Sequence, residues 1–186
     1  INIRLRHTVW PRLLDAALSH GGSYGGSRLR GGVKANGEYV AANPTGPLTL
    51  GHGRQAVIGD CIARLLDATG QRVTREYYFN DSGRQVRVLG ASVIARRLGE
   101  PLPEEAYRGS YVDELAAAMP EEVWQAATAP GEDREARVGD WAGARIRDGI
   151  ESSLDRLGVH FDVWKSEASL HDEGWVARAV ALLREG

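Results

Sequence analysis

Apolar residues recur every three or four positions along much of this chain, with polar residues between them, which predicts amphipathic helices. In the segment 51–66 the apolar set is Val57, Ile58, Cys61, Ile62, Leu65 and Leu66, and we expect it to face a core. Similar spacing predicts helices over residues 7–20, around Val86 to Leu98, and over 111–119, 121–127, 134–157 and 175–183.

Three shorter segments have the composition of strands. Residues 33–42 alternate loosely, residues 73–79 are dense in Tyr and β-branched residues, and residues 159–164 form a third short run. Because helices separate the three strands, we expect an α/β fold with a parallel sheet, right-handed crossovers and helices on both faces. The long helical stretch between the second and third strands is predicted to be an insertion.

Some local features support this division. Gly21 to Gly32 contains six glycines and is interpreted as a linker; a phosphate-cradling loop is the alternative, but no Gly-Lys-Ser/Thr follows it. Asp81 or Ser82 is expected to cap the helix that follows, although a ligand contact is equally open for Asp81. Cys61 is expected to be a small buried hydrophobe.

Composition narrows the class of protein. The 186 residues are 42% hydrophobic and 26% charged, with a net charge of −2, which is typical of a globular domain. A single cysteine excludes an internal disulfide and a cysteine-based metal cluster, and the histidines have no metal-ligand spacing, so we expect no metal bound by the protein. No apolar run reaches the roughly 18 residues of a membrane span, so no membrane partner is expected.

The candidate chemistry lies in a turn-rich run that leads directly into the predicted helix 51–66. Gly51 has no side chain, so a nucleotide can approach the backbone. His52 can donate a hydrogen bond to charge that develops on a phosphate, and Thr49 can add a hydroxyl. The simpler alternative is a turn glycine followed by a capping histidine. The run consists of Ala42, Asn43, Pro44, Thr45, Gly46, Pro47, Leu48, Thr49, Leu50, Gly51 and His52.

This run resembles the His-x-Gly-His signature of the arginyl-tRNA synthetases, a family of class I aminoacyl-tRNA synthetases, which Ala-Asn-Pro-Thr-Gly-Pro commonly precedes. Three further segments are similar to motifs of that family, in the same order along the chain. They are Glu76-Tyr77-Tyr78-Phe79-Asn80-Asp81-Ser82-Gly83-Arg84-Gln85, Tyr107-Arg108-Gly109-Ser110-Tyr111, and Leu157 to Trp164 with Ser166-Glu167.

The resemblance implies a Rossmann-like sheet and an aminoacyl-tRNA ligase of the cytoplasm. Such an enzyme, a monomer at full length, activates arginine with ATP and Mg²⁺ to arginyl-adenylate and then transfers the arginyl group to tRNA(Arg). His52 and Gly51 match ATP-binding positions of the signature, and Thr49 stands where its first histidine is usual. We expect the Thr49 hydroxyl to substitute for that histidine.

The resemblance also implies an arginine-binding set. Asn43 matches the asparagine that binds the amino-acid end, and Glu38 matches a carboxylate that faces the guanidinium, a pairing with geometric sense. Ala41 stands where the family often has serine, so that a backbone contact is retained. The alternatives are an edge-strand charge for Glu38 and turn formation before Pro44 for Asn43.

Other expected parts of such a synthetase are missing. The sequence has no Lys-Met-Ser-Lys-like loop and no anticodon-reading helical domain, and it begins with Ile1 rather than Met. We therefore expect a piece of a longer chain, inactive on its own. Residues 1–32 would be the tail of an additional N-terminal domain, whose last strand Ile1 to Leu5 resembles, plus the linker. Residues 33–186 would be the N-terminal half of the catalytic domain.

Two other functions remain open from sequence. Small nucleotidyltransferases use Thr-x-Gly-His to transfer a nucleotide to a phosphate ester, and they are nearly this short. The Asn-Pro-Thr-Gly-Pro run and the segment 76–85 count against them. A paralogue that binds nucleotide without catalysis is the other alternative.

Overall fold

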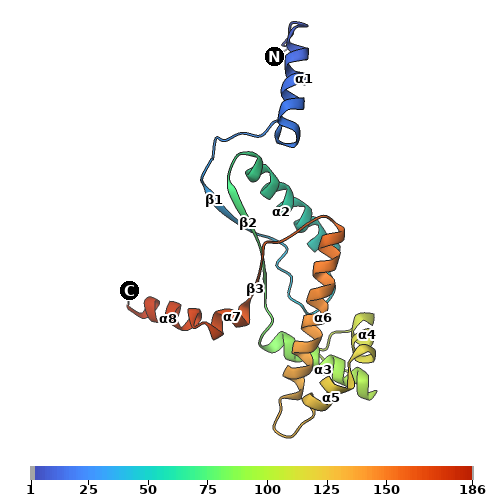
Figure 1. The fold of residues 1–186 in the computed structure, drawn as a ribbon. Coiled ribbons are helices and arrows are strands. Elements are labelled where there is room, and N and C mark those ends of the chain that lie inside the picture. Colours follow the sequence, from blue (N-terminus) through green and yellow to red (C-terminus); the bar gives the residue numbers. More distant parts are fainter. Residues whose placement is uncertain (1–2, 186) are drawn as a thin grey trace.

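The structure is a computed structural model that describes residues 3–185 (Figure 1). These residues form a three-stranded parallel sheet in the order β1-β2-β3, with β1 spanning Lys34–Glu38, β2 Arg72–Phe79 and β3 Val163–Ser166. The pairing of β1 with β2 runs from Lys34 opposite Arg72 to Glu38 opposite Glu76, and that of β2 with β3 runs from Glu76 opposite Val163 to Phe79 opposite Ser166. The predicted α/β class with a parallel sheet and a helical insertion is confirmed.

The helices lie close to their predicted positions. They are α1 (Val9–His20), α2 (Leu50–Ala68), α3 (Arg84–Leu98), α4 (Ser110–Ala118), α5 (Glu121–Ala127), α6 (Arg134–Arg156), α7 (Glu167–Asp172) and α8 (Trp175–Glu185), with a 3-10 turn, η1, at Gly21–Ser23. The short helix α7 was not predicted. Among residues 3–185, every helix is too short or too polar to cross a membrane.

The first strand ends earlier than its sequence predicts. The expected strand 33–42 is reduced to β1 because Val40 and Ala41 take positive φ angles of 66° and 44°. The Ala41 N–H donates to the Tyr39 carbonyl at 2.9 Å, which closes a three-residue turn around Val40. A β-branched residue in this region is strained, so the surrounding structure must hold the turn in place.

The third strand begins later than predicted, at Val163 instead of Val159. Gly158 has a φ of 76°, its N–H donates to Asp155, and the Val159 N–H donates to Leu154. This pair of hydrogen bonds is the Schellman arrangement that closes a helix. Residues 157–159 therefore end α6 and leave only the following segment for pairing with β2.

The insertion is organised by a close crossing of α3 and α6 (Figure 1). Gly90 of α3 and Gly139 of α6 lie at the crossing, where the two backbones approach without side chains between them. Val86, Leu89, Val93, Val138, Ala142 and Ile146 are buried around them. The insertion thus has a tightly packed core that continues into that of the sheet.

An aromatic cluster joins β2 to the segment that contains β3. Tyr77 stacks on Trp164 with ring centroids 4.3 Å apart and meets Phe161 edge-on at 5.2 Å. Tyr77 and Phe79 are buried on one face of β2, where Ala56 of α2 and Leu154 of α6 belong to the same core. Thr74 on the opposite face of β2 is exposed in the described structure.

The apolar stripe predicted for α2 does not face this core. The buried residues of α2 are the small Ala56 and Ala63 together with Asp60, whereas Val57, Ile58, Ile62 and Leu65 are exposed. Cys61, expected to be buried, is exposed as well. Small side chains allow α2 to lie close to the sheet, so its larger apolar residues lie on the outer side.

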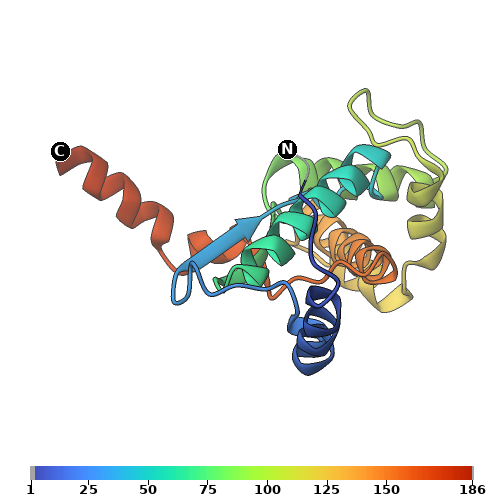
Figure 2. The same cartoon turned by 90° about the horizontal axis from the view of Figure 1, so that it is seen from above.

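The glycine-rich segment 21–32, interpreted as a linker, lies against the end of α2. The Ser27 N–H donates to the Ala68 carbonyl at 2.7 Å, and the Arg30 N–H donates to that of Thr69 at 3.1 Å. The helices at either end of the chain, α1 and α8, project from the body and have no buried residue among those described (Figures 1 and 2). Residues 3–5 are not in a strand, and residues 1–2 of the resembling segment lie outside the described residues.

Candidate functional site

The candidate residues gather where β1 and β2 end. In a parallel α/β sheet the carboxyl ends of the strands, and the helix N-termini that follow them, form the usual ligand-binding edge. Here the chain leaves β1 at Glu38, makes the turn at Val40 and Ala41, and enters α2 at Leu50. The predicted site residues from Glu38 to His52 therefore line one edge of the sheet.

Thr49 and His52 form a capping box at the start of α2. The Thr49 Oγ1 accepts from the His52 N–H at 3.4 Å, and the Thr49 N–H donates to the His52 Nδ1 at 3.1 Å. Because a backbone N–H can only donate, Nδ1 acts as the acceptor in this hydrogen bond. The proton then lies on Nε2, which can donate to a ligand.

The start of α2 is open toward solvent. Leu50 is 93% exposed, and a Cβ built on Gly51 would make only an ordinary contact with the Thr49 Oγ1 at 3.5 Å. The protein's own packing therefore does not require glycine at this position, whereas close approach of a ligand to the helix would. A helix N-terminus with exposed N–H groups favours anions such as phosphate.

Tyr77 holds the turn that precedes the signature run. Its hydroxyl accepts from the Ala42 N–H at 3.1 Å and donates to the Ala42 carbonyl at 2.9 Å. Burial of the ring raises the pKa of Tyr77 to about 12, although its hydrogen bond to the Ala42 backbone acts in the opposite direction. Tyr77 thus provides a hydrogen-bond partner for both backbone polar groups of Ala42, the residue that follows Val40 and Ala41.

Asn43 is held from the other side by the segment 76–85. Its Oδ1 accepts from the Asn80 N–H at 3.1 Å, and its Nδ2 donates to the Gln85 Oε1 at 2.8 Å. The structure therefore links two of the motifs noted in the sequence. Asn80 had no role assigned from sequence, and its place in the second motif was the available signal.

Glu38 and Ala41 lie beside a groove between the end of β1 and α2. Glu38 is exposed and pairs in register with Glu76 of β2. Glu38 and Ala41 help to line a cavity of about 500 Å³, together with Tyr39, Arg54 and Ile58. Its lining is mostly apolar apart from Glu38, Arg54 and Gln55.

The predicted helix cap at Asp81 or Ser82 is wrong. The N-cap of α3 is Gly83, and it makes no side-chain capping hydrogen bond among the described residues. Asp81 instead accepts from the Ser166 hydroxyl at 2.7 Å and from the Ala168 N–H at 3.1 Å, at the start of α7. It ties the loop after β2 to the end of β3, a long-range contact that local sequence cannot reveal.

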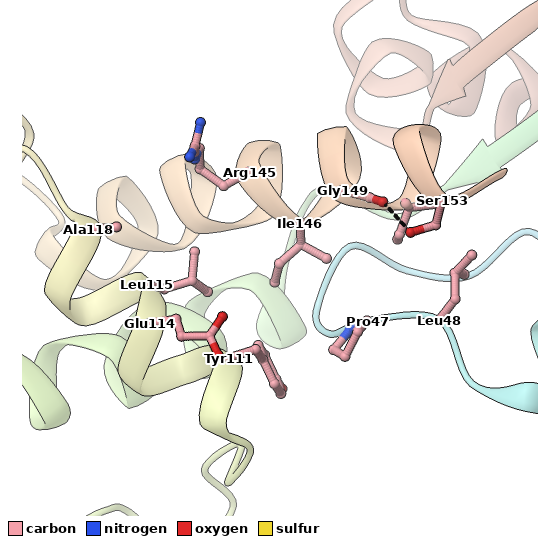
Figure 3. Close-up of a pocket in the computed structure, with 11 residues that line it drawn as sticks. Pro47, Leu48, Tyr111, Glu114, Leu115, Ala118, Arg145, Ile146, Gly149 and Ser153 are labelled. Carbon is pink, nitrogen blue, oxygen red and sulfur yellow. Dashed lines mark hydrogen bonds between the residues drawn. The ribbon is translucent and has the colours of Figure 1, made fainter. Parts of the chain in front are cut away.

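A second cavity, of about 440 Å³, lies between α4, α6 and the signature run (Figure 3). Pro47 and Leu48 form one side, while Leu115 of α4 and Ile146 of α6 lie across from them. Tyr111 donates to the Thr45 carbonyl at 2.9 Å. The third motif in the sequence thus contacts the first directly and supports the turn before α2.

Within residues 3–185, no cluster of three or more His, Cys, Asp or Glu side chains could hold a metal ion.

The strand order and the helix beginning beyond β1 define an α/β protein of Rossmann-like topology. Residues 14–107 match the family model described as tRNA synthetases class I (R), catalytic domain. The chain therefore belongs to this family, the arginine-type class I tRNA synthetases.

Individual relatives agree with this assignment. The chain is 40% identical over 190 residues to an arginine–tRNA ligase from Desulfotalea psychrophila, with 100% of the chain and 34% of the relative covered. It is 41% identical over 191 residues to one from Syntrophotalea carbinolica, with the same coverage. The chain thus spans about a third of the length of the curated relatives that it matches.

Solved structures show the same similarity. A crystal structure from Campylobacter jejuni, provisionally assigned as an arginyl-tRNA synthetase, superposes with a TM-score of 0.74 at 31% identity, covering 90% of this chain and 38% of that one. The Thermus thermophilus arginyl-tRNA synthetase gives a TM-score of 0.62 at 26% identity, covering 99% of this chain and 31% of that one.

Proposed function

We propose that this chain forms part of an arginine–tRNA ligase, which activates arginine with ATP and transfers it to tRNA(Arg). The observation that carries the proposal is the start of α2, where the His52 Nδ1 is engaged by Thr49 and its Nε2–H is left to donate. The names of the relatives support arginine as the amino acid.

The proposed first step is attack of the arginine carboxylate on the α-phosphorus of ATP, with pyrophosphate leaving. Negative charge is spread over the phosphate oxygens during this displacement. The Nε2–H of His52 and the exposed N–H groups at the start of α2 would stabilise that charge. Gly51 would let the nucleotide approach the helix, and Thr49 would act mainly by holding His52.

Arginine would bind at the end of β1. The Glu38 carboxylate would accept from the guanidinium, because a planar fork of donors matches two carboxylate oxygens. Asn43 would bind the amino-acid end, and Ala41 would contribute its backbone. This placement is supported by the short path of the chain from Glu38 to Asn43 along the same sheet edge.

The remaining parts of the site would come from elsewhere in the natural polypeptide. We propose that residues 33–186 are the first half of a Rossmann-like catalytic domain and that residues 1–32 are the tail of a preceding domain with its linker. The exposed apolar residues of α2 and the edge strand β1, which pairs only with β2 among residues 3–185, offer a surface for the second half. Mg²⁺ would arrive with the phosphates of ATP, and a cytoplasmic monomer is the proposed state.

The test is arginine-dependent exchange of pyrophosphate into ATP, measured with tRNA(Arg) present on the natural polypeptide that contains this chain. His52→Ala should slow exchange by about 100-fold, as expected when a donor to the transition state is lost. His160→Ala is the matched control, because His160 is exposed and pairs with Asp155. Exchange near the wild-type rate in His52→Ala would refute the role of His52.

A further inference from the structure

The orientation of the Asn43 side chain is fixed by its two hydrogen-bond partners. The Asn80 backbone N–H can only donate, so the Asn43 atom that lies 3.1 Å from it must be the carbonyl oxygen Oδ1. The Nδ2 atom therefore faces the other way and donates to Gln85 at 2.8 Å. The Gln85 amide is in turn oriented with its Oε1 toward Asn43.

This arrangement determines what Asn43 can offer a ligand. One of the two Nδ2 hydrogens is used by Gln85, and the Oδ1 already accepts from Asn80. The second Nδ2 hydrogen remains as a donor. A donor in this position suits a carboxylate oxygen of the amino acid, because hydrogen bonds to a charged acceptor are stronger than neutral ones.

Gln85 itself contributes little to the fold. It is exposed, and it lies in the first turn of α3, after the helix has begun at Arg84. The terminal torsion of an asparagine is broad, so a single partner restrains its amide less than two partners do. Gln85 therefore adds the second restraint on Asn43, from a different element than the one that bears Asn80.

We propose that Gln85 is a positioning residue for amino-acid binding, acting through Asn43 without touching the substrate. The inference rests on the proposed function, in which Asn43 binds the amino-acid end of arginine. It also assigns a purpose to the last residue of the segment 76–85. The motif both supports the turn, through Tyr77, and sets the orientation of the Asn43 amide, through Asn80 and Gln85.

The test is a double-mutant cycle on the natural polypeptide, with variants Asn43→Ala, Gln85→Ala and the pair together. We expect Gln85→Ala to raise the arginine KM about five- to tenfold, as loss of order in one side chain does. The ATP KM should stay within about twofold, and in the Asn43→Ala background Gln85→Ala should add nothing. Gln125→Ala on α5 is the control, since Gln125 is an exposed helical glutamine.

The arginine KM values of the variants separate the positioning role of Gln85 from the binding role of Asn43. An unchanged arginine KM in Gln85→Ala, with a raised value in Asn43→Ala, would overturn the positioning role and leave the proposed function standing. Independent, multiplying effects of the two variants would also overturn it. An unchanged arginine KM in Asn43→Ala would refute the binding role of Asn43 itself, and the inference with it. A fall in melting temperature for Gln85→Ala beyond that of Gln125→Ala would contradict action through Asn43 alone.

Discussion

Gly90 of α3 and Gly139 of α6 lie backbone against backbone, so that a Cβ atom added to Gly90 would be only 2.8 Å from the main-chain nitrogen of Gly139. A Cβ on Gly139 would in turn lie 2.9 Å from the Val86 carbonyl carbon. Both distances are too short for real atoms, and the obstacle is backbone, which cannot rotate away. The close packing of α3 on α6 therefore requires glycine at both position 90 and position 139.

Gly139→Ala should destabilise the chain by about 3 kcal/mol, at the upper end of the usual cost of overpacking a core. The matched control is Gly149→Ala on the same helix, where an added Cβ meets nothing within 4 Å. The free energy of unfolding of Gly149→Ala should rise by up to about 1 kcal/mol, because alanine has a higher helix propensity than glycine. Urea unfolding of both variants measures the difference, and equal stabilities would contradict the close crossing.

Tyr77→Phe should lower the free energy of unfolding by about 2 kcal/mol, because it leaves the buried N–H and carbonyl of Ala42 without their partner. Tyr24→Phe is the control, since Tyr24 is 49% exposed. Chemical denaturation followed by circular dichroism measures both. If the two variants lose the same stability, the double hydrogen bond does not hold the turn.

Thr49→Ala should lower the free energy of unfolding by about 1 kcal/mol, the usual effect of removing an N-cap hydroxyl. Thr49→Ser keeps the Oγ that accepts from the His52 N–H and should remain within a few tenths of wild type. Thermal unfolding compares the two. If Thr49→Ser is as unstable as Thr49→Ala, the methyl group of Thr49, and not its capping hydroxyl, provides the stability.

If arginine binds as proposed, with its guanidinium facing Glu38, Glu38→Gln should raise the arginine KM of the natural polypeptide by about tenfold, because it replaces a charged acceptor with a neutral one. Discrimination between arginine and citrulline should fall by a similar factor. Glu151→Gln, an exposed position on α6, serves as the control. Steady-state exchange kinetics give both quantities, and unchanged discrimination would exclude contact between Glu38 and the guanidinium.

Asp140→Asn should stabilise the chain at neutral pH and not in acid. Partial desolvation, followed by the negative charge of Asp81, raises the pKa of the Asp140 carboxyl above 3.8. A raised folded pKa gives stability that is present below the unfolded value and lost as the pH rises through the folded value. The asparagine variant does not titrate, so its advantage over wild type should grow across that interval.

Unfolding measured at several pH values between about 3 and 7 tests this linkage. Asp15→Asn, an exposed position on the projecting helix α1, is the reference for removing a carboxylate. An advantage for Asp140→Asn that is the same at every pH would mean that the carboxyl titrates alike in the folded and unfolded chain.

The sequence predicted the elements well because helical spacing and β-rich runs are local signals. The start of α2 is an example: Thr49 precedes the apolar repeat, and the structure places the N-cap there. Which face of a helix is buried depends on its neighbours instead. The stripe of Val57, Ile58 and Ile62 has the pattern of a core face, yet the close fit of α2 to the sheet uses Ala56 and Ala63.

The candidate site was predictable as a set of residues, but its internal connections were not. Proximity in sequence groups Glu38, Asn43 and His52, and a motif pattern identifies the segment 76–85. The contact of Asp81 with the start of α7 joins residues more than 80 positions apart. No local propensity encodes such a contact, which explains why a helix cap was predicted there.

The parallel pairing of β2 with β3 has a consequence for synthesis of the chain. Arg75 and Asp162, which hydrogen-bond beside this pairing, are 87 residues apart in sequence. At roughly 5–20 residues per second, β2 leaves the ribosome on the order of 4–17 s before its partner. Throughout that interval Tyr77 lacks the ring of Trp164, so the aromatic face of β2 stays without this stacking partner until β3 has been synthesised.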